Sequence, residues 1–304
     1  MASIYEFFGY RSDDQSVAAK RAVAAETCPF LQGGEKCEKK FRDGVISGVC
    51  AVKPATSGPV ICCPIRLYAE DYKILRDVSD KAFTPGLEIV NGRNAVTHAK
   101  RGQQSCVAVF GQRWGGELYV PKKEGQGSYF VDWILALLNK DGELEEFVAI
   151  EVQTIDTTGT YRNGFEELKK TGEVIGTTAG LNWENVNKRI LPQLVYKGQL
   201  LQREEMCKKG LFFVCPEPVY QKIMARLGGE EKLVKYTLQP ASITFFVYDY
   251  DRHDPQTPGT DIKLSRVVDH TTTVYKLQEA FNNVTLPEEN VYKRAILRAL
   301  APIY

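Results

Sequence analysis

Histidine is scarce in this chain: its three copies, His98, His253 and His270, form no H-x-x-x-H pair and no triad-like grouping. Chemistry that relies on histidine as a base or as a metal ligand is therefore disfavoured. The sequence also has no P-loop, no G-x-G-x-x-G and no G-x-S-x-G motif. These absences argue against a P-loop nucleotide hydrolase, a dinucleotide-binding oxidoreductase and an α/β-type serine hydrolase.

Long apolar runs and an excess of one charge are missing too. No 18-residue stretch is apolar throughout, and the start MASIYEFFGYRSDD lacks a basic region followed by an apolar one, so we expect a cytoplasmic protein with no membrane partner. Lys and Arg (39) balance Asp and Glu (38) to a net charge of +1. A phosphate-binding surface would have to come from the distribution of charge. The 304 residues allow one large domain or two smaller ones.

Residues 128–154, SYFVDWILALLNKDGELEEFVAIEVQT, predict two long strands folded back at Asp141-Gly142. Asp-Gly between apolar runs is typical of a two-residue hairpin turn in which both residues have positive φ. Such a turn pairs Lys140 with Glu143, and the residue numbers of every opposed pair then add up to 283. Asp132 consequently faces Glu151, with Cβ atoms roughly 4.5–5.5 Å apart. Gln153, two residues further on, points the same way.

Both faces of these strands are otherwise apolar, which predicts that the hairpin lies centrally in a sheet. Two carboxylates held close together in a partly buried site cost free energy that a divalent cation would offset. The alternative is that one of the two carboxylates lies in solvent at the end of the sheet. Glu117, after Gly115-Gly116, either approaches the same metal site or faces solvent in a turn.

Four of the eight cysteines, Cys28, Cys37, Cys50 and Cys63, are separated by eight, twelve and twelve residues, with Gly, Pro and Ser in the intervals. We expect reduced thiols, and four thiolates in a tetrahedral set select zinc or iron. Such a site would be structural because it leaves no open position. Cys62 competes with Cys63 for the fourth position, and scattered core cysteines remain the alternative. The other three, Cys106, Cys207 and Cys215, are expected in the core.

After the hairpin, strands and helices alternate, which predicts an α/β fold with a mixed central sheet flanked by helices. Strands are expected at 210–215 and 241–251, and a kink at Pro192 within a helical stretch. Helices are expected at 15–26, 69–80, 182–205, 219–227, 274–284 and 287–300. Asp249, Asp251, His253 and Asp254 are read as part of a solvated turn after a strand.

These residues resemble a family, the NotI-type type II restriction endonucleases, a branch of the PD-(D/E)xK nucleases with a four-cysteine iron site near the N-terminus. The resemblance covers most of the chain. It rests on CPF at 28–30 with the later cysteines, on Glu117, on VDW at 131–133, on EVQTIDTTG at 151–159 and on NKRILPQL at 187–194. It implies iron, or zinc as the alternative, on Cys28, Cys37, Cys50 and Cys63, and catalytic magnesium on Glu117, Asp132 and Glu151. Gln153 stands where the wider superfamily has lysine, which leaves open what replaces the ammonium.

The resemblance implies a Mg²⁺-dependent endonuclease that cuts double-stranded DNA at a palindromic, GC-rich site as a homodimer. It divides the chain into a cysteine module over 1–68 and a PD-(D/E)xK (α+β) nuclease core with DNA-recognition elements over 69–304. The rival functions are a non-enzymatic DNA-binding protein with a structural metal site and a repair nuclease on the same core. The basic residues nearest the site in sequence either grip DNA or are ordinary solvated charges: Lys122-Lys123, Arg162, Lys169-Lys170 and Lys188-Arg189.

Overall fold

The computed structural model of the chain describes residues 1–116, 118, 130–283 and 288–301. Its largest element is a seven-stranded sheet with the order β13-β12-β11-β8-β7-β6-β5. The strands are β5 (Ile89–Asn91), β6 (Cys106–Gly111), β7 (Trp133–Leu138), β8 (Leu144–Val152), β11 (Leu211–Pro216), β12 (Ser242–Tyr250) and β13 (Leu264–Thr273). The sheet is mixed: β8, β11 and β12 run parallel, whereas β7 is antiparallel to both of its neighbours. The mixed central sheet and the central hairpin of β7 and β8 are thus confirmed.

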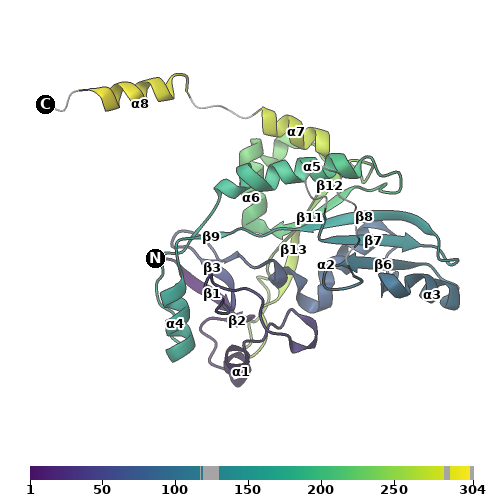
Figure 1. Cartoon of the computed structure of the whole chain (residues 1–304), viewed down its shortest axis with the longest axis horizontal. Coiled ribbons are helices and arrows are strands. Elements are labelled where there is room, and N and C mark those ends of the chain that lie inside the picture. The colour runs from purple at the N-terminus through teal and green to yellow at the C-terminus, as the bar shows by residue number, and fades with distance from the viewer. Residues whose placement is uncertain (117, 119–129, 284–287, 302–304) are drawn as a thin grey trace.

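Alternate residues of the strands face two different helical layers. Ala149, Phe213 and Phe245 lie in one apolar cluster with α5 (Leu191–Leu201), α6 (Glu217–Leu227) and α7 (Val274–Asn282). Ile150 and Phe212 lie in the opposite cluster with α2 (Ala69–Ala82) and the N-terminal strands. Figure 1 shows α5, α6 and α7 gathered on one side of β11 and β12. A residue of β8 with an odd number therefore points towards α5.

The N-terminal part forms a second sheet, with the order β2-β1-β3-β4. Its elements are β1 (Ser3–Phe7), β2 (Tyr10–Arg11), α1 (Val17–Ala25), η1 (Gln32–Gly34), β3 (Val49–Lys53), β4 (Val60–Ile61) and η2 (Pro64–Tyr68). Its apolar residues join those of α2 and the large sheet in one cluster. The elements that remain are α3 (Gly92–Gly102), β9 (Thr157–Thr158), α4 (Arg162–Thr171), β10 (Gly180–Leu181), η3 (Val186–Ile190), η4 (Glu230–Lys232) and α8 (Val291–Leu300).

Most of the expected helices and strands are present, including the interruption at Pro192. The stretch divides into η3, a π-helical turn, and α5, which carries Pro192 in its first turn. Leu191 donates its N–H to Val186, five residues back, so the wide turn precedes the proline that cannot donate. The N-terminal sheet, β5, α3 and β13 were not anticipated. In the described part of the chain, no helix is both long and apolar enough to cross a membrane.

The turn of the central hairpin differs from the expected one. Only Gly142 has a positive φ (77°), and Asn139, not Lys140, pairs with Glu143. Asn139 Oδ1 accepts the N–H groups of Asp141 and Glu143, so an Asn-capped turn with one extra residue closes the hairpin. A bulge between Leu137 and Leu138 then restores the expected pairing, which holds from Leu137–Glu146 to Trp133–Ile150. The strand also begins later than expected, at Trp133.

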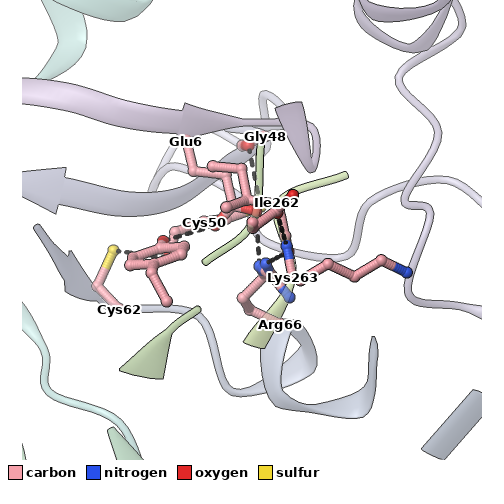
Figure 2. A network of polar contacts seen from close by, with 9 residues as sticks. Glu6, Gly48, Cys50, Cys62, Arg66, Ile262 and Lys263 are labelled. Atoms are coloured by element: carbon pink, nitrogen blue, oxygen red, sulfur yellow. Dashed lines mark hydrogen bonds and ion pairs between the residues drawn. The ribbon is translucent and has the colours of Figure 1, made fainter. Parts of the chain in front are cut away.

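A buried ion pair joins the N-terminal sheet to the far side of the large sheet. Arg66 Nε lies 2.6 Å from Glu6 Oε1, and both side chains are inaccessible to solvent. Tyr250 donates to the other oxygen of Glu6 (2.8 Å), and Arg66 also donates to the carbonyl of Ile262. Figure 2 shows Arg66 pointing at Glu6 and at the backbone of Ile262. The pair thereby fixes β1, η2 and the segment before β13 against one another.

Replacing Arg66 with Met should lower the free energy of unfolding by about 3–5 kcal/mol, because Glu6 would be left buried without its cation. Chemical denaturation measures this loss. Lys188→Met is the control, since it removes a cation from the exposed pair with Glu184 and should cost less than about 1 kcal/mol. Equal stabilities of the two variants would show that the buried pair is not needed.

Candidate active site

Asp132 lies directly before β7 and is tied to β8 by its side chain. Its Oδ2 accepts the N–H of Val152 at 2.7 Å, next to Glu151 in the chain. Asp132 is exposed to solvent, as in the alternative that one carboxylate lies in solvent at the end of the sheet. The surrounding protein still desolvates the carboxylate enough to raise its pKa, against the opposing effects of the Val152 N–H and of Lys197. The register of the hairpin therefore brings Asp132 to Glu151, as the sequence predicts.

Glu151 lies on β8, between β7 and β11, and points to the α5 side of the sheet. Its side chain is 13% exposed. Burial, and after it repulsion from Asp132, raises the pKa of Glu151 to about 7, while Lys197 opposes the shift. Its Oε2 is buried, and the Lys197 ammonium lies 2.5 Å from this oxygen. The carboxylate is therefore placed where a cation would stabilise its charged form.

Lys197 is a residue that the sequence interpretation missed. It projects from α5, and its Nζ lies 2.5 Å from Glu151 Oε2, with only 14% of the side chain exposed. Ile190, Leu194 and Leu201 are buried on the same helical face, at spacings of seven, three and four residues from Lys197. A lysine inside an apolar helical stripe was the available signal. Its partner on β8, 46 residues earlier in the chain, could not be read from that stripe.

Gln153 shares the face of Glu151. Its N–H donates to Val214 at 2.9 Å, and its Nε2 donates to the carbonyl of Thr154 at 2.6 Å. Gln153, Glu151, Gln193 and Lys197 line a small cavity with room for about one water molecule. The structure thus brings together Asp132, Glu151 and Gln153 and adds two polar side chains from α5. Their roles in catalysis stay predictions.

Of the other predicted site residues, some lie outside the described residues and others are paired elsewhere. Glu117, Lys122 and Lys123 lie outside the described residues. Arg162 is paired with Asp43 and Glu166, and Lys169 with Glu26. Lys188 contacts Glu184, and Arg189 lies 3.4 Å from Asp156. These four cations are thus neutralised by carboxylates of the same chain.

The cysteines gather in the N-terminal part, where Cys28, Cys37, Cys50 and Cys63 are all buried free thiols. The four thiols are close enough to interact electrostatically. A thiolate at Cys37 or Cys63 would raise the pKa of Cys28, and one at Cys63 or Cys28 would raise the pKa of Cys50. Burial raises the pKa of Cys28 to about 12 and that of Cys63 to about 11. As the described side chains stand, no three Cys, His, Asp or Glu groups converge on one point as metal ligands would.

Lys39 accompanies the thiols as a half-buried cation. Its Nζ donates to the carbonyls of Val49 and Cys62 and to Cys62 Sγ, at 3.1, 3.1 and 3.2 Å. Burial lowers the pKa of Lys39, but Cys62 and Cys63 outweigh this effect and raise it. Cys62 therefore faces the lysine. Lys39 acts on Cys63 as well, so the choice of Cys63 over Cys62 as the fourth ligand stays a prediction.

The remaining polar candidates have structural roles. Asp251 accepts the N–H of His253, and Asp254 accepts those of Gln256 and Lys263, as in the expected turn. The assignment of Asp249 to that turn was wrong: Asp249 lies in β12, where burial, and after it a hydrogen bond with Glu217, raises its pKa to about 6. His270 is buried between Tyr220 and the carbonyl of Leu233. Cys106, Cys207 and Cys215 are core thiols, as predicted.

The comparison with known families covers both of these sites. Residues 11–263 match the family model described as restriction endonuclease NotI. The matched region includes the four spaced cysteines, the central hairpin and α5. A search of curated proteins finds no match to the chain. Because the family model spans most of the sequence, the chain belongs to the NotI restriction endonuclease family.

Proposed function

We propose that this type II restriction endonuclease hydrolyses phosphodiester bonds of double-stranded DNA within one short sequence, using Mg²⁺ held by Asp132 and Glu151. The observation that supports the proposal is the convergence of these carboxylates at one end of the central hairpin. Oxygen ligands suit magnesium, and Glu117 is the third candidate ligand. Membership of the restriction endonuclease family supports DNA as the substrate, and the two carboxylates of the hairpin support metal-assisted hydrolysis.

The donor set fits a divalent cation. Burial, and after it repulsion from Asp132, disfavours the charged form of Glu151, and Lys197 offsets these effects only in part. A positive charge between the two side chains would offset both costs. When bound, Mg²⁺ would polarise the scissile phosphate and lower the pKa of the attacking water.

The side chains around the carboxylates have separate tasks. The N–H of Val152 holds Asp132 in its orientation. Gln153 offers a carbonyl and an amide, so it can orient water or hydrogen-bond a phosphate oxygen, but it carries no positive charge. Gln193 lines the same cavity and can do the same from α5. The site therefore contains neutral donors and acceptors beside two anions.

We also propose that Cys28, Cys37, Cys50 and Cys63 bind one structural iron, with zinc as the alternative. The four thiols are buried near one another, and a tetrathiolate centre carries excess negative charge. Lys39 is a half-buried cation beside Cys62 and Cys63 and would balance part of that charge. The thiols would have to turn towards one another to share the ion.

We propose in addition that the protein acts as a homodimer on a palindromic, GC-rich duplex site. The described part of the chain holds one hairpin with the D…E-x-Q set, so one subunit can cut one strand at a time. Cleavage of both strands at one locus then needs two copies, and a two-fold arrangement makes the half-sites equivalent.

Purified protein should cut duplex DNA in Mg²⁺ at one repeated sequence, which sequencing of the fragment ends would reveal. Asp132→Ala and Glu151→Ala should abolish cleavage but keep DNA binding in Ca²⁺, because they remove metal ligands and negative charge near the phosphate. Asp141→Ala, at the exposed turn of the same hairpin, should cut normally. Cleavage by either site variant at the wild-type rate would refute the assignment. If the wild type bound DNA specifically but did not cut it, a non-enzymatic DNA-binding protein would be favoured. If the cut ends had no sequence in common, a repair nuclease would be favoured.

Protein purified without added metal should contain about one iron or zinc per chain, detectable by elemental analysis. Cys28→Ser and Cys50→Ser should lose the metal and melt at a lower temperature, because metal binding in such sites contributes folding free energy. Cys207→Ser changes a buried core thiol elsewhere and should keep the metal. Active wild-type protein free of transition metal would rule out the site.

Sedimentation of the protein on an oligonucleotide that carries the cognate site should give two chains per duplex. A duplex with one half-site replaced should bind more weakly and should not be cut in both strands. One chain per intact duplex, with nicked DNA as the sole product, would exclude the homodimer.

A further inference from the structure

The active site contains a buried ammonium that comes from outside the hairpin. Lys197 Nζ is 2.5 Å from Glu151 Oε2, and the two side chains are 14% and 13% exposed. Its charge also acts on Asp132, so it affects both carboxylates. Lys197 lines the same cavity as Gln153 and Gln193. This cation is therefore held at the point where the two anions meet.

The position of Lys197 is set by how α5 lies on the sheet. Leu191, Leu194 and Leu201 are buried on this helix, and Leu194 also lines the cavity, opposite Phe213 of β11. The helix is thus fixed by apolar packing on both sides of the lysine. The long side chain crosses that apolar layer to reach Glu151, as lysine stems do.

Stability alone gives a weak reason to keep such a pair. Ion pairs in the interior are often no better for folding than apolar residues of the same size, because desolvation costs about as much as the attraction returns. α5 already has apolar contacts that hold it on the sheet. Two carboxylates beside a scissile phosphate, in contrast, bring together three negative groups, and positive charge there is what phosphate hydrolysis needs.

We propose that Lys197 supplies the positive charge that Gln153 cannot provide, and that it is a positioning residue acting through Glu151. Its contact with Oε2 holds the Glu151 carboxylate in place in the site before DNA arrives, and its charge offsets the repulsion between the carboxylates and the phosphate. Lys197 is also a cation beside metal-binding oxygens, so it opposes divalent ions in the DNA-free protein. This inference rests on the proposed function.

The two effects have opposite signs when Lys197 is removed, which separates this role from a structural one. Lys197→Met should slow single-turnover cleavage of the cognate duplex at saturating Mg²⁺ by about tenfold or more. The same variant without DNA should bind Mn²⁺ more tightly than the wild type in isothermal titration calorimetry, because a repelling charge is gone. If the Lys197→Met variant does not fold, Lys197→Gln, which also removes the positive charge, takes its place in both measurements.

Lys209→Met is the matched control. Lys209 Nζ lies 2.7 Å from Glu146 Oε1, and Glu146 is on β8, the strand that also carries Glu151. The Lys209 side chain is 28% exposed and that of Glu146 is 13% exposed, so the pair resembles Lys197–Glu151 but does not involve Asp132. Its removal should change neither cleavage nor Mn²⁺ affinity. Slower cleavage with tighter Mn²⁺ binding in the Lys197 variant alone supports the proposal, and any other combination overturns it. Failure of the wild type to cut DNA would instead refute the proposed function, and the inference would fall with it.

Discussion

The pairing of β7 with β8 is the constraint on which the site depends. Because these strands lie between β6 and β11, a slip of one residue would turn every side chain to the opposite cluster and break three ladders together. The register is thus protected by the whole sheet. It survives a turn one residue longer than a two-residue loop, since the bulge after Leu137 removes the excess. Asp132 and Glu151 meet because apolar faces fix the strands between them.

The sequence predicts what is local or strictly periodic. The Asp-Gly pair between two apolar runs predicted the central hairpin, and the two-residue period of a strand predicted the shared face of Glu151 and Gln153. The run from Leu211 to Pro216 was long and apolar enough to mark a strand. The prediction of a two-residue turn was wrong because the Asn139 side chain accepts backbone N–H groups of the turn and favours a longer loop. The Asp-Gly pair alone does not reveal this hydrogen bonding. β13 was missed because its middle is polar on an exposed face. Lys197 was missed because its role exists only when α5 lies on β8.

Buried charge is treated in two different ways in this molecule. Glu6 has Arg66 on one oxygen and the Tyr250 hydroxyl on the other, so its charge is matched inside the core. Glu151 has one cation, Lys197, on its Oε2 and a second carboxylate, Asp132, nearby, so two anions share one ammonium. The first arrangement satisfies both carboxylate oxygens, although Arg66 Nη1 has no hydrogen-bond partner among the described residues, and it holds the layers together. The second is incomplete, which costs folding free energy and leaves the site able to take up a cation.

A chain of contacts leads from the cysteines to the carboxylates. Cys63 is followed directly by η2, whose last residue, Tyr68, accepts the indole N–H of Trp133 at 3.3 Å. The rings of Tyr68 and Tyr72 pack edge-on against Trp133, with centroids 5.5 and 5.4 Å away. Asp132 precedes this tryptophan and lies close enough to Tyr68 to raise the pKa of its hydroxyl, an effect that adds to that of burial. A metal that fixes Cys63 would therefore also fix the edge of β7 from which Asp132 projects, so a structural centre far from the chemistry can still determine how well the carboxylates are aligned.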